Sequence, residues 1–122
     1  MAKRLLIVDD SRVSRMIIKS KVASLGVDWE LQEAVSGDAA LEQALHWQPD
    51  FVTMDVNMPG LSGFDAAQRL RELYPQVAVV LLTANVQESS RERANLLGVH
   101  FVSKPVTEAA IEQVVRHFQA AA

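Results

Sequence analysis

The chain has 122 residues, of which 49% are hydrophobic and 22% charged, and this length and composition predict one globular domain over residues 1–122. Its net charge of −3 argues against a nucleic-acid-binding surface, and the absence of cysteine excludes disulfides and thiolate metal sites. No apolar run approaches the roughly 18 residues of a membrane span. The basic start MAKR soon meets acidic residues, unlike a secretion signal, so we expect a cytoplasmic protein.

Five segments have the composition of β-strands. Continuous apolar runs rich in β-branched residues are typical of strands that are buried on both faces of a parallel sheet. A more polar run, WELQEAV at 29–35, predicts a strand at the edge of the sheet. The apolar runs are residues 5–8, 51–55, 77–84 and 99–105.

Helical patterns alternate with these strands. Ser62 and Asp65 have the spacing of a capping box, with Asp in place of the usual Glu. Residues 86–97 have few apolar side chains and many charges, and we expect them to form the most loosely packed helix. The other predicted helices are 12–25 before Gly26, 37–47 after Ser36, 63–74 after Ser62 and 107–119 from Thr107.

This alternation of strands and helices predicts the fold class. Five strand–helix units give an α/β protein with a parallel sheet, helices on both faces and right-handed crossovers. The flavodoxin-like (βα)5 order 2-1-3-4-5 is the leading arrangement because it leaves the polar second strand at an edge. In such folds, ligands bind beyond the carboxyl ends of the strands, between strands 1 and 3.

Polar residues stand at the ends of the predicted strands. Asp9 and Asp10 follow the first strand and Asp55 ends the third, while Thr83 and Lys104 end the fourth and fifth. Three clustered carboxylates repel one another unless they hold a cation, and Mg²⁺ leaves room for a phosphate oxygen. With a hydroxyl and an ammonium group nearby, this set predicts a phosphoryl-transfer site.

Four motifs at these strand ends resemble those of response-regulator receiver domains of two-component signalling, in particular the stand-alone, chemotaxis-type (CheY-like) members. Each motif alone is common, but all four occur in the family's order at the expected strand ends, and the resemblance covers the whole chain. It implies a phosphorylation-controlled signalling switch. The motifs are VDDS, MDVNMPGLSGFD, LLTAN and FVSKP.

The resemblance implies a metal site with Mg²⁺ as the cofactor. Asp10 and Asp55 would bind the ion directly, and Asp9 would act mainly through water. The backbone carbonyl of Asn57 would be a further ligand. Pro59 and Gly60, like Gly63 beyond them, would shape the loop after the third strand rather than contact phosphate.

The resemblance also implies the phosphoryl chemistry. Asp55 would be the phosphoacceptor, and Thr83 and Lys104 would contact the phosphoryl oxygens. Phe101, three residues before the lysine, stands where many members have tyrosine, and it would turn inward when Thr83 moves toward the phosphate. The chain would promote only its own phosphorylation and dephosphorylation, so we do not expect an enzyme that acts on other substrates.

The partners implied are proteins. A histidine kinase or a phosphotransfer protein would donate the phosphoryl group, and the output would be the binding of a target by a monomer, with no contact to nucleic acid or membrane. We expect the target on the face made by helix 86–97, strand 5 and helix 107–119, because the first of these requires the least free energy to shift. Candidate contacts at its rim are Arg91, Arg93, Glu108 and Glu112.

Two other function classes fit parts of the pattern. An aspartyl-phosphate phosphohydrolase of the haloacid-dehalogenase type would need an acid where Asn57 stands. A flavodoxin-like binding module would need a phosphate-cradling loop where the sequence has DDSRVS. Taken singly, Thr83 also fits an ordinary strand residue, Lys104 a snorkelling side chain and Phe101 a core residue.

Overall fold

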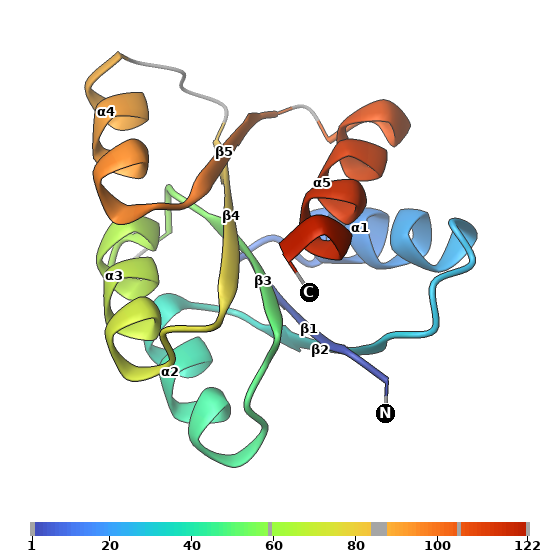
Figure 1. Cartoon of the computed structure of the whole chain (residues 1–122), viewed down its shortest axis with the longest axis horizontal. Coiled ribbons are helices and arrows are strands. Elements are labelled where there is room, and N and C mark those ends of the chain that lie inside the picture. Colours follow the sequence, from blue (N-terminus) through green and yellow to red (C-terminus); the bar gives the residue numbers. More distant parts are fainter. Residues whose placement is uncertain (1, 59, 84–87, 105, 122) are drawn as a thin grey trace.

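The protein, a computed structural model that describes residues 2–58, 60–83, 88–104 and 106–121, alternates strand and helix throughout (Figure 1). This order confirms the predicted fold class. The elements are β1 (Arg4–Val8), α1 (Arg12–Ser24), β2 (Glu30–Ala34), α2 (Gly37–His46), β3 (Phe51–Asp55), α3 (Gly63–Leu73), β4 (Ala78–Thr83), α4 (Glu88–Leu97), β5 (His100–Ser103) and α5 (Glu108–Ala121).

The predicted bounds differ from the observed ones mainly at the C-terminal end. Helix α5 continues to Ala121, beyond the predicted end at 119, because its last residues are good helix formers with no stop signal among them. Residues 84 and 105, the predicted ends of two strands, and 86–87, the predicted start of α4, lie outside the described residues. Among the described helices, none has the length and apolar character needed to cross a membrane.

The five strands form one parallel sheet in the order β2-β1-β3-β4-β5, which confirms the predicted topology. The central strand β3 is buried along its whole length, whereas β2, at one edge, is only partly covered. Because all strands run in the same direction, their carboxyl ends meet at one edge of the sheet. The polar residues at the strand ends are therefore brought together.

Helices cover both faces of the sheet, with α1 and α5 on one side and α2, α3 and α4 on the other (Figure 1). The side chains of β1 alternate between the two layers, as a pleated strand requires. Leu5 and Ile7 join the core beneath α1 and α5, and Leu6 and Val8 join the core beneath the other three helices. The site residues at the end of β1 thus rest on a strand held from both faces.

Thr53 is a polar residue in the middle of the buried strand β3. It pairs in register with Ile7 on β1, and its side chain is 1% exposed. Its Oγ1 is buried without a hydrogen-bond partner among the described residues. A buried hydroxyl in this state destabilises the fold, since it has lost its hydrogen bonds to water.

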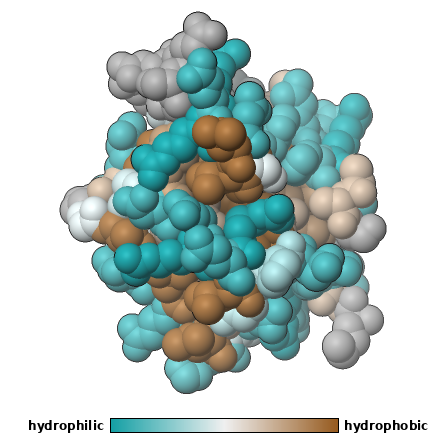
Figure 2. All heavy atoms as spheres, turned by 60° about the vertical axis from the view of Figure 1, so that its left-hand side comes forward, coloured by the Kyte–Doolittle hydropathy of each residue, from teal (hydrophilic) through white to brown (hydrophobic). Residues whose placement is uncertain are grey.

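Helix α4 has the thin apolar face expected from its sequence. Ala94 is its only fully buried side chain among residues 91–97, and Leu96 is 88% exposed. Leu45 on α2 and Leu73 on α3 are also exposed near the ends of their helices. Figure 2 brings forward the side of the molecule on which α2, α3 and α4 lie. On this face, charged and polar side chains separate the apolar patches (Figure 2).

An ion pair joins α4 to α3. Arg93 Nη2 lies 2.6 Å from Asp65 Oδ1, and its guanidinium lies over the Phe64 ring at 4.8 Å. The predicted capping box at the start of α3 is therefore only half formed. The backbone N–H of Asp65 donates to Ser62 Oγ at 3.2 Å, but the Asp65 carboxylate turns to Arg93.

Candidate functional site

Three carboxylates meet where β1 and β3 end. Asp9, Asp10 and Asp55 each offer an oxygen, and these oxygens all lie within 4.8 Å of one another. Asp9 is 1% exposed and Asp55 5% exposed, whereas Asp10 is open to solvent. The cluster predicted from the strand ends is therefore formed, with two buried acids and one that faces water.

Backbone hydrogen bonds fix the chain where it leaves β1. The Asp9 N–H donates to the carbonyl of Ala34 on β2 at 3.1 Å. Asp9 Oδ1 accepts from the Ser11 N–H at 2.9 Å, and Ser11 Oγ in turn caps α1 by accepting from the Ser14 N–H at 3.3 Å. A tight turn therefore joins the acidic pair directly to the start of a helix.

Lys104 supplies the counter-charge of the cluster. Its Nζ lies 3.1 Å from Asp9 Oδ2 and 3.4 Å from Asp55 Oδ1, and its side chain is 19% exposed. The Lys104 N–H donates to the carbonyl of Thr83 at 2.7 Å, which anchors the residue after β5 to the end of β4. The ammonium group thus bridges the acids of β1 and β3 from the other side of the site.

Burial and charge oppose each other at this site. Burial raises the pKa of Asp55 above its usual 3.8, and the charge of Asp9 adds to this effect, while Lys104 and a backbone hydrogen bond from Asn57 oppose it. Burial acts to lower the pKa of Lys104, but the hydrogen bond and charge of Asp9, together with Asp55, raise it above 10.5. Lys104 therefore stays charged, and the two buried acids compete for it.

The donor set fits a hard divalent cation. Carboxylate oxygens are the ligands that Mg²⁺ prefers, and an ion bound by one or two carboxylates keeps several waters. The exposed Asp10 and the Asp55 carboxylate could contact such an ion. Both oxygens of Asp9 already accept hydrogen bonds, from Ser11 and Lys104, which suits a role through water.

Glycines let the loop after β3 lie close to the site. A Cβ atom on Gly63 would collide with the carbonyl oxygen of Asp55, so only glycine fits where α3 begins. Gly60 has a φ of +81°, a conformation that side chains disfavour. Both therefore have the loop-shaping features expected of them, while Pro59 lies outside the described residues. Asn57, also in this loop, is exposed.

Thr83 and Phe101 lie on neighbouring strands. Thr83 ends β4 and is 1% exposed. Phe101 on β5 pairs with Leu81 in register and is half-buried, packed against the core beneath α2, α3 and α4, which Leu97 of α4 also joins. A packing path therefore exists between β5 and α4, and the switching of Phe101 stays a prediction.

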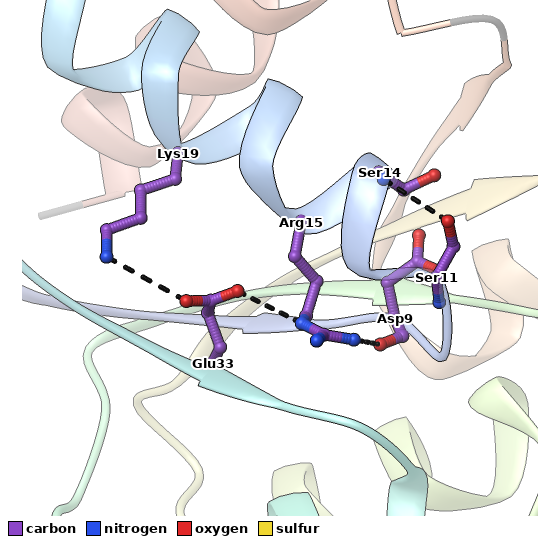
Figure 3. A network of polar contacts seen from close by, with 6 residues as sticks. All are labelled: Asp9, Ser11, Ser14, Arg15, Lys19 and Glu33. Carbon is purple, nitrogen blue, oxygen red and sulfur yellow. Dashed lines mark hydrogen bonds and ion pairs between the residues drawn. The ribbon is translucent and has the colours of Figure 1, made fainter.

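Sequence reasoning missed one residue beside the site. Arg15 of α1 donates from Nη1 to the carbonyl oxygen of Asp9 at 2.8 Å and from Nε to Glu33 at 3.0 Å (Figure 3). A basic residue on the first turn of a helix that follows two acids is the only signal for it in the sequence. Its partner Glu33 lies on a different strand, so spacing along the chain could not reveal the contact.

The chain matches a known protein family over most of its length. The model of the response regulator receiver domain matches residues 5–116. The chain belongs to this receiver-domain family. It is 34% identical over 106 residues to the chemotaxis protein CheY of Thermotoga maritima, covering 86% of this chain and 88% of that protein.

Two further comparisons show the range of proteins that carry such a domain. The chain is 38% identical over 110 residues to the autoinducer 1 sensor kinase/phosphatase LuxN of Vibrio harveyi, covering 90% of this chain but only 13% of LuxN. A CheY-like receiver domain protein of Methanospirillum hungatei, 18% identical, has the same fold with a TM-score of 0.89, and the match covers 99% of this chain and 97% of that one.

Membership in this family establishes the general function. The receiver domain is a phosphorylation-controlled signalling switch of two-component systems. The two alternatives, an aspartyl-phosphate phosphohydrolase and a flavodoxin-like binding module, are not favoured by these relatives. The acidic cluster also fits the Mg²⁺ that receiver domains use.

Proposed function

We propose that Asp55 is the phosphoacceptor, and that Asp10 and Asp55 hold Mg²⁺ directly, with Asp9 acting through water and the Asn57 carbonyl as a further ligand. The observation that carries the proposal is the surrounding of Asp55. It lies on the central strand, 5% exposed, with an ammonium group at 3.4 Å and two other carboxylates within 4.8 Å.

The proposed reaction moves one phosphoryl group. A carboxylate oxygen of Asp55 attacks phosphorus, the P–N bond to the donor imidazole breaks, and the released imidazole takes up a proton. The product is an acyl phosphate on β3. Mg²⁺, when bound, supplies positive charge that offsets the phosphoryl oxygens in the transition state.

Two side chains of this protein would contact the phosphoryl group of the product. Lys104 already contacts the Asp55 carboxylate. Once that carboxylate has become part of the acyl phosphate, the ammonium group can pair with a negatively charged phosphoryl oxygen instead. Thr83 ends the neighbouring strand and would donate its hydroxyl to another phosphoryl oxygen. Movement of Thr83 would give Phe101 room to turn inward.

The donor and the target are proteins in this proposal. The likeness to LuxN, a sensor kinase/phosphatase, supports a histidine kinase or a phosphotransfer protein as the donor. The target would bind the face made by α4, β5 and α5, and the chain would act in the cytoplasm as a monomeric switch, not as an enzyme on other substrates. Arg91 and Glu108 are exposed on this face, whereas Arg93 already pairs with Asp65.

Labelling with acetyl phosphate and Mg²⁺ tests the phosphoacceptor. We expect the wild type to gain the mass of one phosphoryl group and Asp55→Asn to gain none. Asp50→Asn is the matched control, because Asp50 receives the Arg4 N–H at the opposite end of the sheet and should label normally. Labelling of Asp55→Asn at the normal rate would overturn the assignment.

A second variant separates the chemistry from the signal. Thr83→Ala keeps Asp55 and the metal ligands, so it should still accept phosphate but transmit it poorly. Amide exchange with fluoroberyllate and Mg²⁺, which mimic the phosphorylated state, should change over α4, β5 and α5 in the wild type and much less in the variant. Changes confined to α1 and α2 in the wild type would contradict the proposed target face.

A further inference from the structure

Every backbone and side-chain polar group of Asp9 has a hydrogen-bond partner. Its N–H donates to the Ala34 carbonyl at 3.1 Å, and its carbonyl oxygen accepts from Arg15 Nη1 at 2.8 Å. Its carboxylate oxygens accept from the Ser11 N–H at 2.9 Å and from Lys104 Nζ at 3.1 Å. Asp9 is thus held from β2, α1 and the end of β5 at once, which is more than a water-linked metal contact requires.

Among the residues that hydrogen-bond to Asp9, Arg15 also links Asp9 to a side chain on another strand. Its side chain is 12% exposed, and its guanidinium spans from the Asp9 carbonyl to Glu33 on the edge strand β2 (Figure 3). Lys19, one turn along α1, adds a longer contact of 3.8 Å to the other oxygen of Glu33. Glu33 therefore holds the arginine in place from outside the site.

The shape of the arginine suits this position. A guanidinium donates from several N–H groups in a fixed fork, so it can serve two acceptors at a set angle. Here one N–H binds a main-chain carbonyl and another binds a carboxylate on a different strand. A lysine has the same charge but a single ammonium nitrogen, and it could not hold both acceptors in this geometry.

We propose that Arg15, held by Glu33, is a positioning residue that fixes the turn at Asp9 and thereby orients Asp10 toward a bound cation. The inference rests on the proposed function, since it assumes that the acidic cluster binds Mg²⁺. Asp10 directly follows the carbonyl that Arg15 holds. Fixing that peptide group limits the directions in which the Asp10 carboxylate can point.

Charge and positioning predict opposite results for Arg15→Ala. Removing a positive charge close to three carboxylates should strengthen the binding of a cation if only the Coulomb energy matters. If Arg15 positions the turn, its removal should weaken binding, since loss of groups that orient metal ligands typically lowers affinity by about 10-fold or more. The sign of the change therefore separates the two roles.

Calorimetric titration of the full chain with Mg²⁺ is the test. We expect Arg15→Ala and Arg15→Lys to raise the Kd for Mg²⁺ by about 10-fold. Arg15→Lys keeps the charge and loses the fork, so weak binding in both variants assigns the effect to geometry. Lys21→Met is the matched control, because it removes one positive charge from the same helix, and the Lys21 side chain has no ion pair to Asp9 or Glu33 among the described residues. Its Kd should change by less than about 2-fold.

Amide exchange in Mg²⁺-free buffer gives a second readout. Exchange at residues 9–11 should be faster in Arg15→Ala than in the wild type, at a temperature where both are folded. An unchanged or lower Kd in Arg15→Ala, with normal binding by the wild type, would overturn this inference alone. Failure of the wild type to bind Mg²⁺ would overturn the proposed function and this inference with it, and Glu33→Gln, which should also weaken binding, replaces Arg15→Ala if that variant does not fold.

Discussion

Lys104 Nζ lies 3.1 Å from Asp9 Oδ2, although the two residues are 95 positions apart in the chain. Asp9 is 1% exposed, and among the described residues its carboxylate forms no other ion pair. One ammonium group therefore neutralises a buried acid of β1 and also lies against Asp55 of β3. The stability of the site and its chemistry depend on the same contact.

This contact should make the free energy of unfolding fall at alkaline pH. The pKa of Lys104 is raised in the folded state, so its contribution to stability is present below its usual pKa of 10.5 and is lost as pH rises through the folded value. We expect Lys104→Met to lower the free energy of unfolding by about 3 kcal/mol at neutral pH, because it leaves Asp9 buried without a counter-charge. Urea unfolding of both proteins at a series of pH values measures the free energy of unfolding. The values for wild type and variant should converge as pH rises through the folded-state pKa of Lys104, and a constant difference between them would contradict the prediction.

Asp55→Asn should stabilise the Mg²⁺-free protein. Burial raises the pKa of Asp55, so the contribution of this group is favourable below its usual 3.8 and is lost as pH rises through the folded value. At neutral pH we therefore expect the variant to be more stable by about 1 kcal/mol, which raises Tm by about 3–6 °C. Thermal unfolding at neutral and acidic pH should show a gain that shrinks at low pH; a lower Tm in the variant at neutral pH would mean that the contact with Lys104 outweighs burial.

Mg²⁺ should stabilise the protein through Asp10. An ion that binds only the folded state at 100 times its Kd adds about 2.7 kcal/mol. We expect this rise in the wild type and none in Asp10→Ala, which should also fail to accept phosphate. Asp28→Ala, at an exposed acid outside the cluster, is the control and should respond as the wild type does. A normal response of Asp10→Ala to Mg²⁺ would reject the cluster as the metal site.

Thr53→Val should raise stability, in contrast to most changes in a protein core. Its hydroxyl is buried without a partner among the described residues, so replacing it with a methyl group removes a desolvation penalty of about 1–2 kcal/mol. The same substitution at Thr107 should lower stability by about 1 kcal/mol, because Thr107 Oγ1 accepts from the Ala110 N–H at 3.1 Å at the start of α5. Urea unfolding of the two variants should give opposite signs, and a loss at both positions would mean that Thr53 has a partner in solution.

Arg93→Ala should loosen α4 without unfolding the domain. Arg93 pairs with Asp65 at 2.6 Å and lies over Phe64, but both partners of the ion pair are about half exposed, so global stability should fall by less than about 1 kcal/mol. Amide exchange over residues 91–97 should nonetheless be faster than in the wild type. Arg91→Ala changes an exposed arginine on the same helix and should leave exchange unchanged; equal effects of the two variants would assign no special role to Arg93.

The fold was predictable because the relevant signals are local. Alternating apolar runs and helical periods fix a parallel sheet, and a parallel sheet by itself brings Asp9, Asp10 and Asp55 to one edge. The polar character of residues 29–35 likewise placed β2 correctly at an edge of the sheet. These inferences need only the order of the elements and not the positions of individual side chains.

Contacts between side chains of distant elements could not be predicted in the same way. His100 of β5 and His117 of α5 stack with ring centroids 4.5 Å apart, although their spacing in the sequence suggests no relationship. Burial and the charge of His100 lower the pKa of His117. The Asp65 carboxylate likewise pairs with Arg93 and does not cap its own helix. This contact depends on α4 lying beside α3, which is a property of the whole fold.

The contact between Lys104 and Asp9 also bears on protein synthesis. While the ribosome has made only the first four strands, Asp9 and Asp55 lack the cation that neutralises them. The residue that does so belongs to the end of β5, and its backbone is anchored to Thr83 only once that strand has joined the sheet. In a nascent chain the two buried acids therefore stay without this counter-charge until β5 and the residue after it have been synthesised and have joined the sheet.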